Sequence, residues 1–156
     1  MEKIKPADYL YTSGYSNRYN PDKIRALYVS GDATTAGEEW ERRSRQMQNQ
    51  LQQVLYSVEA SVVTLDLGDA TILAALNLTQ ADLTAPWQFV PRPSTTQRLG
   101  EAVSKQQRFS AIRYPSDAAR VRGFNGFNMV IFPTAIVVPQ SVIIYDDRGI
   151  EIQRWP

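Results

Sequence analysis

The chain has 156 residues, of which 43% are hydrophobic and 21% charged, and its formal net charge is +1. This length and apolar fraction suit one domain with one core, so we expect residues 1–156 to form a single domain. The near-neutral charge excludes a strong overall field for nucleic acid or acidic membranes. We therefore expect no direct nucleic acid binding and no membrane association.

The sequence contains no histidine and no cysteine. Their absence excludes Ser-His-Asp and Cys-His nucleophile systems, thiol redox chemistry, zinc fingers, haem and iron–sulfur sites. Any catalysis must use carboxylates, hydroxyls, tyrosines, arginines or lysines, and we expect no metal site. A chain without disulfides, whose charged residues 1–6 precede no apolar signal segment, is expected to be cytoplasmic.

The first third of the chain predicts a strand followed by a long helix. Residues 24–30 alternate as a strand does, with Leu27 and Val29 on one face and Tyr28 on the other. Thr35 and Glu38 have the spacing of a capping box at the start of the helix. The apolar stripe of that helix consists of Trp40, Met47, Leu51, Val54, Leu55 and Val58.

The middle of the chain predicts a strand over 61–67 and two short helical segments. Asp69 is expected to cap a helix over 70–76, and the pair Thr79 and Asp82 is expected to start a single turn. After a proline-containing connection, Thr95 or Thr96 is expected to cap a further helix.

The last third of the chain is rich in predicted strands. These cover residues 109–114, 128–132, 141–145 and 150–155, and the last two flank the hairpin signal Asp-Asp-Arg-Gly at 146–149. An early section that mixes strands and helices, followed by a strand-rich end, predicts an α+β fold around a mostly antiparallel sheet.

Arg18 and Glu39 are the two charged residues whose placement is most suggestive of a site. Arg18 lies in a polar, aromatic loop before the first strand, where a guanidinium can bind a phosphate or carboxylate through two parallel hydrogen bonds. The alternative for Arg18 is a surface ion pair. Glu39 lies at the border of the buried stripe and can line a cleft, although an acid in the first turns also complements the helix dipole.

Tyr28 and Ser116 are two further candidates. Tyr28 faces away from Leu27 and can point at the same cleft as Glu39, although strands favour tyrosine for packing alone. Ser116 follows Pro115 at the end of a strand, where site residues often lie. Because no histidine can activate it, we expect Ser116 to act as a hydrogen-bonding hydroxyl, or else to start the next turn.

Together these segments resemble the RES domain, a family named for an Arg, a Glu and a Ser. The resemblance covers roughly residues 10–135, and each segment is weakly specific alone, whereas their order and spacing are fairly specific. It rests on the segments 17–21, 25–30, 35–39, 96–100, 114–116 and 128–132. Arg18, Glu39 and Ser116 match the three residues of the name, and Tyr28 matches the tyrosine of the first strand. The family commonly has Gly-Gly before the Arg, where this chain has Ser16 and Asn17, and its Trp-Arg or Tyr-Arg segment nearer the N-terminus has no clear match here.

The resemblance implies an ADP-ribosyltransferase-like fold with a mostly antiparallel, split sheet and flanking helices. It implies a toxin of a bacterial toxin–antitoxin pair that degrades NAD, as substrate rather than cofactor, by hydrolysis or phosphorolysis. The implied catalytic residues are Glu39, Arg18 and Tyr28, and the implied substrate-binding residues are Arg18, Tyr19, Tyr28 and Ser116. The implied partner is an antitoxin with a Xre-like helix-turn-helix, part of which plugs the active site.

Two other functions stay open at this stage. A protein ADP-ribosyltransferase would break the same bond of NAD and differ only in the acceptor, which no residue here identifies. The other open function is a catalytically silent binding module of the same fold, which the altered residues before Arg18 favour.

Overall fold

Seven strands form two separate sheets in the computed structural model, which describes residues 14–47 and 54–156. The larger sheet has the order β1-β5-β4-β3 and the smaller one the order β2-β6-β7. The strands of the larger sheet are β1 (Leu27–Ser30), β5 (Phe127–Ile131), β4 (Ala111–Pro115) and β3 (Thr64–Asp66). Those of the smaller sheet are β2 (Ser57–Ser61), β6 (Ser141–Tyr145) and β7 (Glu151–Trp155).

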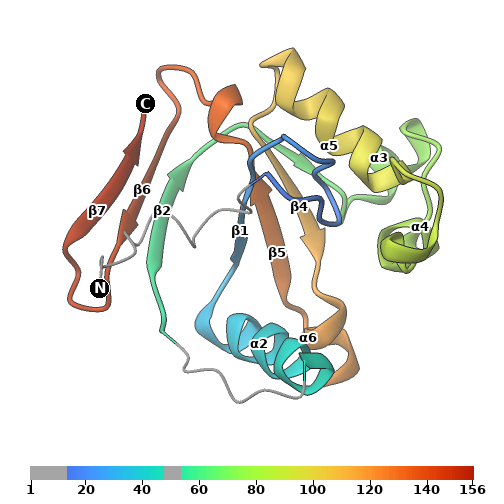
Figure 1. Cartoon of the computed structure of the whole chain (residues 1–156), viewed down its shortest axis with the longest axis horizontal. Coiled ribbons are helices and arrows are strands. Elements are labelled where there is room, and N and C mark those ends of the chain that lie inside the picture. Colours follow the sequence, from blue (N-terminus) through green and yellow to red (C-terminus); the bar gives the residue numbers. More distant parts are fainter. Residues whose placement is uncertain (1–13, 48–53) are drawn as a thin grey trace.

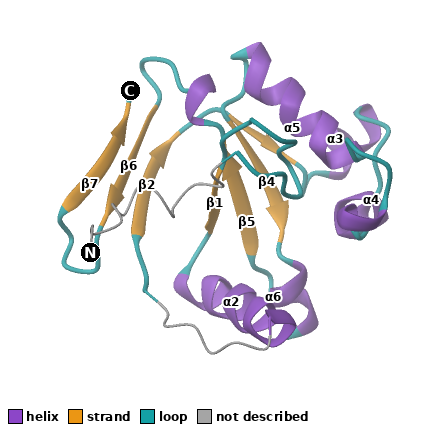
Figure 2. Ribbon diagram, in the orientation of Figure 1, coloured by secondary structure: helices purple, strands orange, loops and turns teal. Residues whose placement is uncertain are grey.

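All strand pairs are antiparallel except β3 with β4. The short loop between β6 and β7 closes the hairpin that its turn residues predict. Helices flank the sheets, as Figure 2 shows. The predicted α+β fold with a mostly antiparallel, split sheet and flanking helices is therefore confirmed.

The helices occupy two places around the larger sheet. α2 and α6 lie side by side across one end of it, whereas α3, α4 and α5 lie together on the other side of the molecule (Figure 1). The helices are α2 (Ala33–Met47), α3 (Ala70–Ala75), α4 (Gln80–Thr84), α5 (Thr95–Gln106) and α6 (Asp117–Val121), with single 3₁₀ turns η1 (Trp87–Phe89) and η2 (Pro133–Ala135). None of these described helices is long and apolar enough to cross a membrane.

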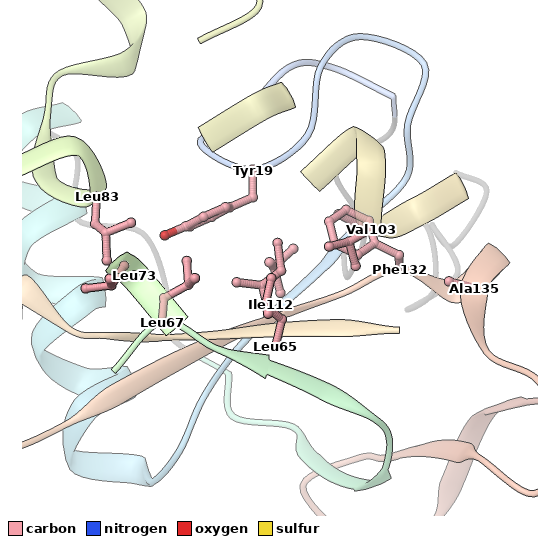
Figure 3. Packing of buried hydrophobic residues seen from close by; sticks show 11 residues of the cluster. Tyr19, Leu65, Leu67, Leu73, Leu83, Val103, Ile112, Phe132 and Ala135 are labelled. Atoms are coloured by element: carbon pink, nitrogen blue, oxygen red, sulfur yellow. The ribbon is translucent and has the colours of Figure 1, made fainter. Parts of the chain in front are cut away.

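Each face of the larger sheet packs against a different layer. Leu27 and Val29 of β1 face the smaller sheet and join a cluster with Ile144 of β6. Ala26 and Tyr28 face the other way, into a cluster with residues of the helices α3, α4 and α5. Figure 3 shows Leu73, Leu83 and Val103 of this cluster. The predicted alternation of the first strand is thus confirmed, and it separates the face that packs on the smaller sheet from the face that carries the candidate residues.

The caps of two helices differ from the predicted ones by a few residues. Asp32, not Thr35, starts α2, because its carboxylate accepts from the backbone N–H of Thr35 (2.8 Å) and from the Thr35 hydroxyl (2.9 Å). Ser94, not Thr95 or Thr96, caps α5 in a capping box with Gln97. The N-cap must have extended backbone angles, and the residue that adopts them is the one just outside the helix. Asp69 and Thr79 cap α3 and α4 as predicted.

The long helix is shorter than its predicted apolar stripe. The described part of α2 ends at Met47, Leu51 lies outside the described residues, and Val58 belongs to β2. β2 pairs along its whole length with β6. Pairing with a distant strand has overridden the helical periodicity here, and the strand predicted over 61–67 is accordingly divided between the end of β2 and β3.

Candidate active site

The face of the larger sheet that carries Tyr28 also carries a row of three hydrogen-bonding side chains at one end. Asn128 of β5 lies between Ser30 of β1 and Tyr114 of β4 in the strand register. Directly opposite residues on neighbouring strands point to the same face, with Cβ atoms about 4.5–5.5 Å apart. This row therefore offers polar groups to a side chain from α2 that packs over it; its members are Ser30, Asn128 and Tyr114.

Glu39 is that side chain. Its Oε1 atom accepts a hydrogen bond from the Ser116 hydroxyl (2.7 Å) and another from Nδ2 of Asn128 (2.6 Å). The structure thus brings together Glu39 and Ser116, two of the predicted site residues, although they lie 77 residues apart in the sequence. Within the described parts of the chain no hydrogen bond engages Oε2 of Glu39, so this oxygen can accept from a ligand.

Ser116 starts the next helix, as one of its two considered roles required, and its hydroxyl bonds to Glu39, whereas a contact with a ligand stays a prediction. It is the N-cap of α6, and its hydroxyl oxygen accepts from the backbone N–H of Ala119 (3.1 Å). The same hydroxyl donates a hydrogen bond to Glu39. Ser116 is buried. Its main effect on a ligand is therefore exerted through the carboxylate that it holds.

Arg18 lies away from Glu39, on the loop that precedes β1. Its Nη1 atom donates to the carbonyl oxygens of Leu83 (2.6 Å) and Ala85 (3.0 Å), at the end of α4. This contact is neither of the predicted ones, since its partners are backbone carbonyls rather than a phosphate or a surface acid. A guanidinium has five N–H donors in a planar fork, so the other nitrogens can still bind an anion.

Tyr28 fixes the loop that carries Arg18. Its hydroxyl donates to Oδ1 of Asn20 (2.8 Å) and accepts from the backbone N–H of Tyr19 (2.9 Å). Burial raises the pKa of Tyr28 above its usual value, so the phenol stays neutral at physiological pH. The hydroxyl of Tyr28 is thus engaged within the protein, and a predicted contact with a ligand would have to use the ring.

Tyr19, a predicted substrate-binding residue, is buried in the core. It has no exposed surface, and its ring packs 4.6 Å from that of Tyr114, centre to centre. Figure 3 shows its hydroxyl directed toward Leu83, and among the described residues that hydroxyl has no hydrogen-bond partner. The structure places the ring of Tyr19 in the core, packed with Leu83 of α4 and Val103 of α5. Its predicted contact with substrate stays a prediction.

Tyr114 was not predicted as a site residue, yet the charges of both Arg18 and Glu39 act on it. Burial raises its pKa most, the acidic groups of Tyr28, Tyr19 and Glu39 raise it further, and the charge of Arg18 opposes them. Tyr114 therefore lies within electrostatic reach of both Arg18 and Glu39. Residues two apart in a strand point to the same face, so the spacing of Ile112 and Tyr114 along β4 could have predicted the face on which this ring lies.

Asn128 is the second residue that the sequence analysis missed. The sequence places it in the segment 128–132 and predicts no role for it, whereas the structure shows it donating to Glu39. Ser30 in turn donates to its Oδ1 atom (2.8 Å). A signal was present, because an asparagine in an otherwise apolar strand needs a reason to be buried.

A cavity of about 280 Å³ lies beside α4, η1 and the start of α5. Trp87 and Arg98 line it, and it shares Ala85 with the contact made by Arg18. Glu39 and Ser116 are not part of its wall. This cavity is therefore separate from the contacts between Glu39 and Ser116.

The model of the RES domain family matches residues 4–152, which is nearly the whole chain. The chain belongs to the RES domain family. The comparisons with curated proteins and with solved structures each gave no match.

Proposed function

We propose that this protein cleaves the bond between nicotinamide and ribose in NAD, with water or phosphate as the acceptor, and that it acts as a toxin of a bacterial toxin–antitoxin pair. Membership of the RES domain family, which is associated with NAD-related toxins, supports the proposal. The single observation that carries it is the carboxylate of Glu39, held at one oxygen by Ser116 and Asn128.

Cleavage of the nicotinamide–ribose bond mainly requires a negative charge near the ribose. The C–N bond breaks with its electron pair passing to the positively charged nicotinamide ring, which becomes neutral, and the ribose carbon becomes cationic. Water then adds and loses a proton, giving ADP-ribose, or phosphate adds, giving ADP-ribose with a phosphate ester on the same ribose carbon. A carboxylate near the developing cation stabilises this transition state more than the ground state.

Each predicted residue has a part in this proposal. Glu39 supplies the charge through Oε2 and orients the acceptor. Arg18 uses its remaining N–H groups for the pyrophosphate of NAD or for the incoming phosphate. Tyr28 keeps the Arg18 loop in place and offers its ring to nicotinamide or ribose, and Ser116 keeps Glu39 in place.

The proposed partner is an antitoxin with a Xre-like helix-turn-helix domain. In this proposal a segment of the antitoxin covers the Glu39 site, so the toxin harms the cell only when its partner is missing. Co-expression of the neighbouring open reading frame, followed by co-purification and a measurement of NAD cleavage, tests the pairing.

The direct test is the change Glu39→Gln. Glutamine keeps the size and can still accept from Ser116 and Asn128, but it lacks the charge, so nicotinamide release should fall on the order of 100-fold or more. Release is measured from NAD with and without phosphate, and thermal unfolding of both proteins checks the fold. An unchanged rate in Glu39→Gln would reject the assignment.

The neighbouring acid provides the control. Glu38 forms an exposed ion pair with Arg122 (2.9 Å) on the outer side of α2, so Glu38→Gln should leave the rate within about two-fold of wild type. Nicotinamide release only after addition of a protein acceptor would identify an ADP-ribosyltransferase instead. No release under any condition, from folded protein, would identify a silent binding module.

A further inference from the structure

Three side chains from three different elements form a continuous hydrogen-bonded chain that ends at Glu39. The Ser30 hydroxyl of β1 donates to Oδ1 of Asn128 (2.8 Å), and Nδ2 of Asn128 on β5 donates to Oε1 of Glu39 on α2 (2.6 Å). Asn128 is only 8% exposed. A buried polar side chain with both ends satisfied is held in one orientation.

The direction of each hydrogen bond in this chain follows from the groups involved. A carboxylate can only accept, so the amide of Asn128 must turn its NH₂ group toward Glu39. Its carbonyl oxygen then points back along the sheet, where a donor is needed. Ser30 supplies that donor, and because Ser30 and Asn128 are partners in the strand register, the sheet itself sets their separation.

The two carboxylate oxygens of Glu39 therefore differ in their hydrogen bonds. Oε1 receives two donors, from Ser116 on one side and Asn128 on the other, which fixes the rotation of the carboxylate about its last bond. Oε2 is thereby aimed in a single direction. A group held within about 10–20° of its productive orientation is what efficient catalysis requires of a preorganised site.

We infer that Asn128, itself held by Ser30, is a positioning residue that orients the Glu39 carboxylate for reaction. This inference rests on the proposed function for its effect on rate, but not for the contact itself. Asn128 and Ser30 act through Glu39 and touch no reacting atom. The competing explanation is that the three side chains merely satisfy one another in a buried place, in which case they affect stability and not turnover.

A pair of nearly isosteric variants at Ser30 separates the two explanations. Ser30→Thr keeps the hydroxyl, Ser30→Val replaces it by a methyl group, and both residues suit a strand. We expect kcat for NAD cleavage to be about 3- to 10-fold lower in Ser30→Val than in Ser30→Thr, the range for one lost hydrogen bond, with KM little changed. The gap should vanish in an Asn128→Ala background, because Ser30 then has no amide to hold.

Two results would overturn the inference. One is equal kcat for Ser30→Thr and Ser30→Val, and the other is an undiminished gap between them in the Asn128→Ala background. Thermal unfolding of all variants is measured alongside, since a purely structural role would lower the unfolding temperature of Ser30→Val while leaving kcat alone.

A second measurement does not depend on activity. In ¹⁵N-labelled protein the side-chain amide signal of Asn128, assigned by its loss in Asn128→Ala, should shift in Glu39→Gln and stay in place in Glu38→Gln. An unmoved signal in Glu39→Gln overturns the contact. If wild-type protein releases no nicotinamide, the proposed function fails, while this signal still decides whether Asn128 holds Glu39.

Discussion

Glu38 and Glu39 are neighbours on α2, yet their carboxylates meet different groups. Successive residues of a helix are rotated by about 100°, so Glu38 points outward to Arg122 while Glu39 points at Ser116 and Asn128. The sequence places both acids in the first turns, where either could serve the helix dipole. Which of them can carry chemistry is decided only by what lies opposite, and that comes from β5 and the start of α6.

Arg18 is the other residue whose identity can be tested directly. Arg18→Lys keeps the charge, but an ammonium group cannot donate to the carbonyls of Leu83 and Ala85 and still present a planar fork to a phosphate. We expect the affinity for NAD to fall on the order of 10-fold, measured by titration with the Glu39→Gln protein so that NAD is not consumed. The affinity of Glu39→Gln alone is the reference, and equal values with and without Arg18→Lys would show that this loop does not hold the phosphates.

At the scale of the elements, α5 must approach the Arg18 loop closely. A Cβ atom on Gly100 of α5 would lie 1.6 Å from the carbonyl oxygen of Tyr19, a separation that the backbone cannot accommodate without moving. We expect Gly100→Ala to destabilise the protein by about 1–3 kcal/mol, as overpacking does, and to weaken NAD cleavage because the loop with Arg18 is displaced. Urea unfolding and nicotinamide release measure the two effects.

The same substitution in another helix should act in the opposite direction. Nothing lies within 4 Å of a Cβ placed on Gly37 in α2. Gly37→Ala therefore adds no clash and removes backbone freedom from the unfolded chain, which should stabilise the protein by about 0.5–1 kcal/mol. A Gly100→Ala protein as stable as Gly37→Ala would show that α5 does not press on the loop as the structure has it.

Much of the element order was predictable because it rests on local signals. The alternation of Leu27, Tyr28 and Val29 and the turn residues between β6 and β7 each depend on a few neighbouring residues, and both predictions are confirmed. The end of α2 was not predictable in this way. Val58 continues a helical stripe in the sequence, and only its pairing with Ile144 of β6 makes it a strand residue.

The candidate site was predictable in its residue types more than in its contacts. The resemblance to the RES domain selected Glu39 and Ser116, which the structure places 2.7 Å apart. The parts played by Asn128 and Tyr114 depend on strand register, which brings them opposite each other from β5 and β4. A register between distant strands leaves no mark in the local sequence. Local signals could therefore have drawn attention to both residues, but not have predicted their contacts.

At the scale of the whole molecule, the tyrosines around the site predict how stability depends on pH. Burial raises the pKa of Tyr19, Tyr28 and Tyr114 above the ordinary value near 10. The folded state therefore keeps phenol protons that the unfolded chain loses, so stability is fully present below about pH 10 and falls as the pH rises from there toward the raised values. Urea midpoints at pH 8, 10 and 11 measure the decline, which should be shallower in Tyr28→Phe, and an equally steep decline would contradict this origin.

Expression of the chain in bacteria tests the proposed activity at the level of the cell. If the protein consumes NAD, cells that produce it without its partner should stop growing, and Glu39→Gln should abolish the arrest at equal protein level. The composition offers few other routes to harm, since the formal charge is +1 and there is no cysteine. NAD in extracts should fall within minutes of induction, before the membrane potential changes. Co-expression of the neighbouring open reading frame, the proposed source of an antitoxin, should restore both NAD and growth. Growth arrest with undiminished NAD would reject NAD depletion and favour ADP-ribosylation of a protein. Normal growth of cells that contain the folded protein would favour the silent binding module.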